Sequence, residues 1–178
     1  IAAGRVPVRK TGDGAYPYDG STNDGEWTGY IPFTELPSQF NPASGFIVTA
    51  NQRIVGTSYK YQQMSRDAAL PWRAKRIYEL INANPKITIR NVVDIQRDVK
   101  SFPHQKLSDD ILKLSAASNE TLSDLRGWDG TMHAESRAAL IVNEIRNCVA
   151  NKIANDNKPI PSWILRERLM WRIIEEKP

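Results

Sequence analysis

The sequence predicts an α+β protein in which short extended segments precede a mainly α-helical body. Two observations support this fold class. Eight of the ten glycines fall in residues 1–56, where turns are frequent and helical patterns are scarce. From about residue 66 onward, apolar residues recur every three or four positions, which is the spacing of one helix face. We therefore expect a β- and loop-rich segment over residues 1–56 and a helical portion over residues 57–178.

The first expected strand covers residues 5–9, RVPVR, in which polar and apolar side chains alternate. Pro7 cannot donate a hydrogen bond to a neighbouring strand, so we expect this strand at a sheet edge, or Pro7 at a strand end. A turn-rich loop follows over residues 11–29. The apolar runs YIPF (residues 30–33) and GFIVTA (residues 45–50) are expected to be short extended segments.

The first expected helix covers residues 73–81, where Ile77, Leu80 and Ile81 form an apolar stripe. Thr88 is expected to be the N-cap of a second helix, because a threonine hydroxyl can accept a hydrogen bond from a backbone N–H of the first turn. That helix carries the apolar residues Val92, Val93 and Ile95.

Short helices are expected after Ser108-Asp109-Asp110 and after Ser118, and Ser162 is expected to cap a last helix. The longest amphipathic stripe of the chain comprises Ala138, Ile141, Ile145, Cys148, Val149 and Ile153. Because Cys148 belongs to this stripe, we expect a buried and inert thiol. It is the only cysteine, so no disulfide can form within the chain.

The charge of the chain permits an anionic partner without requiring one. The net charge is +4 and the pI is about 9.2, but basic residues are interleaved with acidic ones. The densest basic cluster, residues 72–76, holds three charges and is more typical of a solvated helix face than of a nucleic-acid-binding patch. No apolar run approaches the roughly 20 residues that a membrane-spanning helix requires.

Most catalytic and metal-binding patterns are missing from the sequence. Neither His104 nor His133 has a second ligand at metal-binding spacing. The acidic loop at residues 19–26 has its glycine one place away from the calcium-binding pattern and lacks the distal glutamate, so we expect a plain turn. A phosphate-binding loop and a dinucleotide fingerprint are missing too. These patterns predict no metal and no cofactor in this chain, and they leave its role open.

Six short motifs occur in one order along the chain. They are GRVPVR from Gly4, EWTGYIPFTELP from Glu26, NPASGFIVTANQR from Asn41, WRAKRIYELI from Trp72, IQRD from Ile95 and WDG from Trp128. Together they resemble the β-subunit of the penicillin acylase (penicillin amidase) family of N-terminal-nucleophile amide hydrolases. The resemblance covers residues 4 to about 130, and it implies that the extended segments belong to the sheet core of such a hydrolase.

The resemblance implies catalytic roles for two residues. Asn51 matches the asparagine whose side-chain amide, together with a backbone N–H, holds the oxyanion formed in the reaction. Arg73 matches an arginine at the head of a helix that lies near the nucleophile and orients the asparagine and the α-amine or substrate. Two structural alternatives stay open. Asn51 could be a turn residue that closes the segment, and Arg73 could be a surface charge paired with Asp67 or Glu79.

The resemblance also implies where the nucleophile lies. In the family it is a serine at the start of the β-subunit, exposed when a precursor cleaves itself, and its own α-amine serves as the base. That serine lies upstream of GRVPVR. We therefore expect no nucleophile in this chain, which would be an internal fragment of the β-subunit and inactive alone.

Further expectations follow for the parent protein. It would hydrolyse a small acyl-amide through an acyl-enzyme, and the family's substrates include penicillins, other acylated β-lactams and N-acyl homoserine lactones. Its partners would be the α-subunit and the remaining β-subunit of the same precursor. Export to the periplasm or the medium is implied, as is a structural calcium whose acidic ligands find no match in this chain.

Two other classes of function stay open. Residues 66–178 could form a helical interaction module that binds a protein through an exposed apolar stripe, without catalysis. Alternatively, Arg73, Lys75 and Arg76 could bind nucleic acid, although no aromatic platform accompanies these charges. The first alternative predicts concentration-dependent association, and the second predicts binding that falls steeply with salt.

Overall fold

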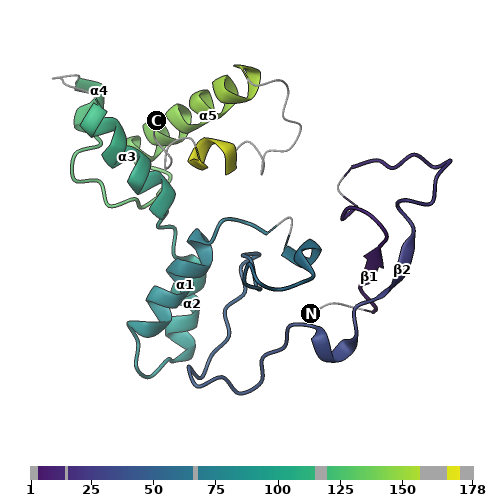
Figure 1. Cartoon of the computed structure of the whole chain (residues 1–178). Coiled ribbons are helices and arrows are strands. Elements are labelled where there is room, and N and C mark those ends of the chain that lie inside the picture. Colours follow the sequence, from purple (N-terminus) through teal and green to yellow (C-terminus); the bar gives the residue numbers. More distant parts are fainter. Residues whose placement is uncertain (1–3, 15, 66–67, 115–119, 157–167, 173–178) are drawn as a thin grey trace. The chain divides into compact units, whose positions relative to one another are not determined.

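The computed structural model describes residues 4–14, 16–65, 68–114, 120–156 and 168–172 (Figure 1). Within these residues, two short strands form one antiparallel sheet and the helices α1 to α5 follow along the chain, so the α+β prediction is confirmed. The chain divides into two compact units. Unit 1 comprises Ile1–Ile47 and Gln52–Ala68, and unit 2 comprises Val48–Asn51 and Ala69–Pro178.

In unit 1, strand β1 (Pro7–Arg9) pairs with strand β2 (Trp27–Tyr30). Pro7 is the first residue of β1, a position that tolerates a residue without a backbone N–H. The strand expected at residues 5–9 is therefore confirmed over its last three residues. A short 3-10 helix, Gln62–Ser65, also belongs to this unit.

The two apolar runs that we expected to be extended differ in structure. The run YIPF ends β2 and leads into a 3-10 helix, Phe33–Glu35. GFIVTA forms no strand: residues 46–49 have no regular structure, although Val48 and Ala50 are each only 7% exposed. A strand requires a partner in a ladder, and the sheet found in the described residues contains β1 and β2 alone. The apolar pattern of this run therefore indicates burial and not strand pairing.

The helical part of unit 2 begins with α1 (Trp72–Asn82) and α2 (Ile89–Arg97). Thr88 caps α2 as predicted. Its Oγ1 accepts a hydrogen bond from the N–H of Asn91 at 3.2 Å, and Oδ1 of Asn91 accepts one from the N–H of Thr88 at 2.9 Å. This capping box satisfies two backbone N–H groups that would otherwise lack a partner. α1 has no such cap, because Pro71 before it makes no side-chain hydrogen bond.

α3 covers Phe102–Leu114, so the prediction that a helix starts after Ser108-Asp109-Asp110 is wrong. Ser108 lies in the middle of α3 and is 1% exposed. The helix can start earlier because Pro103 falls in its first turn, where a missing N–H costs no helical hydrogen bond. α4 (Glu120–Ser123) confirms the helix expected after Ser118, and Ser118 itself lies outside the described residues.

The hydrophobic core lies in unit 2, where α5 (Arg137–Asp156) packs against α3. Residues 168–172 are helical and contribute to this core, whereas the predicted cap at Ser162 lies outside the described residues. The buried cluster comprises Leu107, Leu125, Ala138, Val142, Met170 and Trp171. Removal of these side chains from water is the main stabilising contribution to unit 2.

Cys148 is exposed on α5, so the prediction of a buried thiol is wrong. The first half of α5 directs Ala138, Ala139 and Val142 into the core. Cys148 follows Val142 by six positions, which places it about 120° away around a helix of 3.6 residues per turn. The apolar stripe in the sequence is therefore wider than the face that the core covers.

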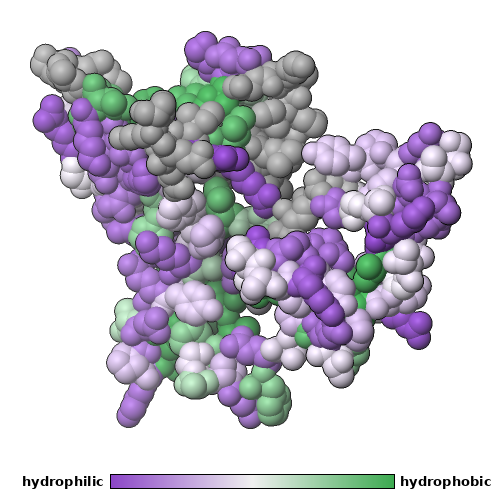
Figure 2. Space-filling model, viewed as in Figure 1, coloured by the Kyte–Doolittle hydropathy of each residue, from purple (hydrophilic) through white to green (hydrophobic). Residues whose placement is uncertain are grey.

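An apolar face also remains exposed on α2. Ile89 is 87% exposed, and Val92 and Val93 are 43% and 36% exposed. Figure 2 shows hydrophobic surface, in green, among hydrophilic residues over the region that α1 and α2 occupy in Figure 1. Among the described residues, no helix is long and apolar enough to cross a membrane.

Candidate functional site

Asn51 ends the segment Val48–Asn51 of unit 2 in a left-handed backbone conformation. Its φ is +63°, in a region that asparagine adopts more readily than most other residues with a side chain. Its carbonyl oxygen accepts a hydrogen bond from the backbone N–H of Ala69 at 2.6 Å. The left-handed backbone of Asn51 and the hydrogen bond from Ala69 therefore set the direction of the exposed Asn51 side chain.

Arg73, the second residue of α1, reaches this segment with its guanidinium group. Its Nη2 donates to the carbonyl oxygen of Ala50 and to Oδ1 of Asn51, both at 2.8 Å. A guanidinium group can only donate hydrogen bonds, so the oxygen end of the Asn51 amide must face it. The N–H bonds of Nδ2 are left to serve another acceptor. Arg73 thus determines which end of the Asn51 amide remains available to another partner.

The two predicted site residues therefore lie in direct contact within unit 2. Of the two pairings that we considered for Arg73 as a surface charge, Glu79 is bonded by Arg76, whereas Asp67 lies outside the described residues and its pairing stays open. Asn51 also adopts the left-handed backbone conformation that asparagine takes up in turns. A turn conformation and a functional side chain are compatible at this position, so the turn does not decide between the two interpretations.

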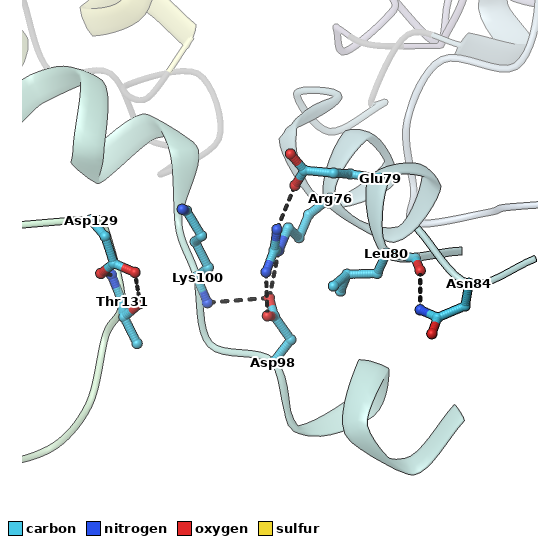
Figure 3. Close-up of polar contacts among 8 residues, drawn as sticks. All are labelled: Arg76, Glu79, Leu80, Asn84, Asp98, Lys100, Asp129 and Thr131. Atoms are coloured by element: carbon cyan, nitrogen blue, oxygen red, sulfur yellow. Dashed lines mark hydrogen bonds and ion pairs between the residues drawn. The ribbon is translucent and has the colours of Figure 1, made fainter. Parts of the chain in front are cut away.

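A second polar cluster lies one helical turn further along α1 (Figure 3). Arg76 donates from Nε to Oδ1 of Asp98 at 2.9 Å and from Nη2 to Oδ2 at 2.7 Å, and its Nη1 pairs with Glu79. The side chains of Arg76 and Asp98 are only 20% and 19% exposed. Hydrogen bonds from Arg76 lower the pKa of Asp98, and the same bonds raise the pKa of Arg76, so both groups stay ionised near neutral pH.

A cavity of about 370 Å³ opens beside this ion pair, between α1, the end of α2 and the start of α3. Arg76 and Asp98 form part of its wall, but Asn51 does not line it. Its apolar lining includes Trp72, Ile77, Leu80, Ile95 and Phe102. The ion pair therefore borders apolar surroundings, where its hydrogen bonds are less screened than they would be in water.

In the acidic loop, residues 19–26, the carboxylate of Asp19 is engaged locally. Oδ1 of Asp19 accepts hydrogen bonds from the N–H of Ser21 at 2.9 Å and from its Oγ at 2.7 Å, and these bonds lower the pKa of Asp19. Asp129 forms the same kind of turn with Thr131 (Figure 3). No group of three or more His, Cys, Asp or Glu side chains in the described part of the chain could hold a metal ion.

The basic cluster at residues 72–76 is engaged within unit 2. Arg73 binds the segment that ends at Asn51, and Arg76 binds Asp98. The Nζ of Lys75 lies 5.1 Å from the centroid of the Phe102 ring, within cation–π distance. These contacts weigh against a free basic patch for nucleic acid.

The pairing of Arg76 with Asp98 was missed by the sequence analysis. Both residues occur in the motifs WRAKRIYELI and IQRD, but they are 22 positions apart, far beyond the three- or four-residue spacing at which helical neighbours can be recognised. Only the spacing of Arg76 and Glu79 was visible in the sequence. Correlated substitutions at the two positions in related sequences would be the signal that could reveal the longer pairing.

Comparison with known proteins adds independent information. A family model described as penicillin amidase matches residues 1–177. The chain is 32% identical over 158 residues to the penicillin acylase 2 proenzyme of Pseudomonas sp. (strain SE83), a match that covers 86% of this chain and 20% of that protein. It is 36% identical over 95 residues to the acyl-homoserine lactone acylase QuiP of Pseudomonas fluorescens (strain Pf0-1), which covers 53% of this chain and 11% of that protein.

Both of these relatives are named as acylases. The acyl-homoserine lactone acylase QuiP of Pseudomonas aeruginosa is likewise 35% identical over 104 residues, covering 58% of this chain and 12% of that protein. The chain belongs to the penicillin amidase family, so the resemblance seen in the six motifs is confirmed. The chain spans about a fifth or less of the length of these relatives.

Proposed function

We propose that the chain is part of an amide hydrolase that cleaves an acyl group from an amine. Membership of the penicillin amidase family supports this proposal, as do the acylase names of the relatives. The main structural support is the hydrogen bond from Arg73 to Oδ1 of Asn51, because this contact leaves the Nδ2 N–H groups of the amide available as donors.

Asn51 stabilises the oxyanion in this proposal. When a nucleophile attacks an amide carbonyl, the carbonyl oxygen gains negative charge, and an N–H donor already aimed at that oxygen lowers the barrier without having to reorganise. Nδ2 of Asn51 can be such a donor, since Arg73 occupies the oxygen end of the amide. Removal of one donor of this kind typically costs about 3 to 4 kcal/mol of transition-state stabilisation, or about a hundred- to a thousandfold in kcat.

Arg73 orients Asn51 and does not take part in bond making. Its Nη2 bonds both Ala50 and Asn51, so it fixes the amide and the peptide before it at once. Without Arg73 the amide of Asn51 could rotate and direct its oxygen toward the developing negative charge. That orientation would repel the oxyanion, so the loss of Arg73 should lower kcat more than it changes KM.

The remaining parts of the reaction lie outside this chain in our proposal. The nucleophile is a serine at the start of the β-subunit, its α-amine is the base, and the reaction passes through an acyl-enzyme. The chain alone is then inactive and works with the α-subunit and the rest of the β-subunit, after the precursor is processed in an exported protein. A structural calcium of that protein is a further part of the proposal, although the described residues contain no group of three or more His, Cys, Asp or Glu side chains that could hold a metal ion.

The test is hydrolysis of a chromogenic acyl-amide by the full-length protein that carries these residues. We expect Asn51→Ala to lower kcat by about a hundredfold or more, with normal processing of the precursor verified by mass spectrometry. Asn82→Ala is the matched control, because Asn82 is an exposed asparagine at the last position of α1 and should leave kcat unchanged.

Two outcomes would contradict the proposal. If processed Asn51→Ala protein kept kcat within about twofold of the unaltered protein, Asn51 would not be an oxyanion donor. If the 178-residue chain alone hydrolysed the substrate, and Asn51→Ala abolished that activity, a nucleophile would lie within this chain. The proposed division of the catalytic residues would then be wrong.

A helical interaction module is the second candidate function, and the exposed apolar face of α2 favours it. Ile89, Val92 and Val93 would bury this face against a protein partner or a second copy of the chain. Sedimentation velocity over a range of concentrations tests this candidate. Association that Val92→Asp removes would support it, and a monomer at all concentrations would contradict self-association through this face.

A further inference from the structure

The first turn of α1 carries the arginine of the candidate site but has no capping side chain. The residue before the helix, Pro71, makes no side-chain hydrogen bond, so the first N–H groups lack the partner that a cap supplies. Helix ends of this kind fray. The position of Arg73 therefore depends on what the neighbouring side chains at the start of α1 contact.

Arg76 makes the firmest of these contacts. It follows Arg73 by three residues, so the two side chains leave neighbouring points on the helix surface. Its Nε and Nη2 each bond one oxygen of Asp98, at 2.9 and 2.7 Å, which is the bidentate and charge-assisted geometry. The guanidinium carbon also lies 5.9 Å from the centroid of the Phe102 ring. Through Arg76, the start of α1 is thus tied to the start of α3 as well as to Asp98.

Asp98 is a fixed acceptor for Arg76. It is the C-cap residue of α2, where its N–H donates to the carbonyl oxygen of Ile95 at 3.3 Å. Its Oδ1 also accepts a hydrogen bond from the backbone N–H of Lys100 at 3.3 Å. Figure 3 shows its carboxylate facing the guanidinium group from the chain that leaves α2. Glu79, by contrast, lies on α1 itself and moves with it, so it cannot anchor the helix.

We infer that Asp98 is a positioning residue for the candidate site: it holds Arg76, which lies one turn beyond Arg73, fixes the start of α1, and thereby keeps Arg73 on Asn51. The inference rests on the proposed function of Asn51 as an oxyanion donor. Nη2 of Arg73 makes both of its hydrogen bonds at 2.8 Å, so a small displacement of the turn would weaken both together. A misplacement of about 1 Å in a supporting element can cost an enzyme about a hundredfold in rate.

The test compares Asp98→Asn with Asp94→Asn in the full-length protein. Asp94 is an exposed aspartate four residues earlier on α2, so Asp94→Asn removes the same charge without touching the Arg76 pair. We expect Asp98→Asn to lower kcat about tenfold while KM changes less than about twofold, and Asp94→Asn to leave both unchanged. In an Arg73→Ala background, Asp98→Asn should change kcat less than about twofold, since the residue through which it acts is gone.

A second measurement does not depend on catalysis. In full-length protein labelled with ¹⁵N-asparagine, the side-chain NH₂ signal of Asn51 is the one that Asn51→Ala removes. We expect Asp98→Asn to shift this signal and Asp94→Asn to leave it in place. Asp98→Glu retains a carboxylate and should shift it less, and it replaces Asp98→Asn if thermal melting shows that the latter does not fold.

Two results would overturn the inference. One is an unchanged Asn51 amide signal in folded Asp98→Asn protein. The other is an equal loss of kcat with and without Arg73, which would mean that Asp98 acts on the whole fold and not through that arginine. If Asn51→Ala instead left turnover intact, the proposed function would fail, and the amide signal would still decide whether Asp98 positions Asn51.

Discussion

Unit 1 and unit 2 are stabilised by different interactions. Among the described residues of unit 1, Ile31 is the one buried apolar side chain, at 5% exposure, while Phe33 and Phe40 are 88% and 89% exposed. Its loops are closed by polar contacts at the surface, such as the hydrogen bond from Nζ of Lys10 to Oδ1 of Asn23 at 2.7 Å. Unit 2 instead contains the whole of the buried cluster around α3 and α5.

The difference indicates which unit can hold a precise site. Surface hydrogen bonds open at low free-energy cost, whereas a core that excludes water opens only with the unit as a whole. Asn51 and Arg73 both belong to unit 2, even though the residues on either side of Val48–Asn51 belong to unit 1. A catalytic donor needs rigid supports, and of the two units it is unit 2 that contains such a core.

The largest expected effect is on the core of unit 2. Leu125 is 1% exposed within the buried cluster, so Leu125→Ala leaves a cavity as well as losing apolar burial. We expect the free energy of unfolding to fall by about 2 to 5 kcal/mol. Urea unfolding of the chain, followed by far-UV circular dichroism, measures it. A loss below about 1 kcal/mol would mean that this core does not hold the unit together.

A smaller loss is expected at the link between α1 and α2. Asp98→Asn removes the charged acceptor of Arg76, and hydrogen bonds to charged groups are worth about 1.5 to 3 kcal/mol. We expect the free energy of unfolding to fall by an amount toward the lower end of that range at neutral pH, because both side chains are still about one-fifth exposed to solvent. The same unfolding experiment checks it, with Asp94→Asn as the control that should change little.

The same ion pair gives a pH dependence with a definite sign. The pKa of Asp98 is lower in the folded protein than its usual 3.8, chiefly through hydrogen bonds from Arg76. Its contribution to stability is therefore fully present above the unfolded pKa, and is lost as the pH falls through the folded pKa. The stability difference between the unaltered chain and Asp98→Asn should shrink as the pH drops below about 4. A difference that grows on acidification would contradict the pairing.

Loss of the N-cap of α2, in unit 2, should lower the free energy of unfolding by an intermediate amount. Thr88→Ala removes the hydroxyl that accepts from the N–H of Asn91, and it leaves that N–H exposed to solvent. The loss of an N-cap typically costs about 1 kcal/mol. Thr88→Ser retains the hydroxyl and should cost less. Thermal unfolding of the two variants separates the effect of the lost cap from the effect of a smaller side chain. Equal losses of stability in both variants would argue against the cap.

The smallest effect is expected in unit 1, on its exposed aromatic side chains. Phe33→Ala removes a large ring that is 88% exposed, so little burial is lost. We expect the free energy of unfolding of the chain to change by less than about 0.5 kcal/mol. Set beside Leu125→Ala, this result would sharpen the contrast between the units. A loss as large as that of Leu125→Ala would erase it.

Local signals in the sequence predicted local structure well. Thr88 was recognisable as a cap because capping involves residues only three positions apart, and Pro7 marked a strand end because it lacks an N–H. The contact of Arg73 with Asn51 was not deducible from spacing, since 22 positions separate them. It was expected only through resemblance to a known family. The structure shows the contact, and the catalytic role of Asn51 stays a prediction.

Features that depend on distant packing were mispredicted or missed. The start of α3 was placed too late because Ser108 has the side chain of a cap, although here it is buried in the middle of a helix. Cys148 was placed inside because a stripe in the sequence does not reveal how much of it a partner covers. Asp98 was overlooked for a similar reason, since its partner Arg76 lies 22 residues earlier in the chain.

The hydrogen bond from Ala69 to Asn51 closes an excursion of the chain, residues 52–68, that belongs to unit 1. The chain thus contributes the four residues Val48–Asn51 to unit 2, then residues 52–68 to unit 1, and belongs to unit 2 again from Ala69. A truncation that discards everything before Ala69 would delete Asn51 together with unit 1. Replacing residues 52–68 with a short turn between Asn51 and Ala69 would instead preserve the segment that meets Arg73. Because each unit is built from two separate stretches of the sequence, neither unit can be exchanged between relatives as one continuous segment.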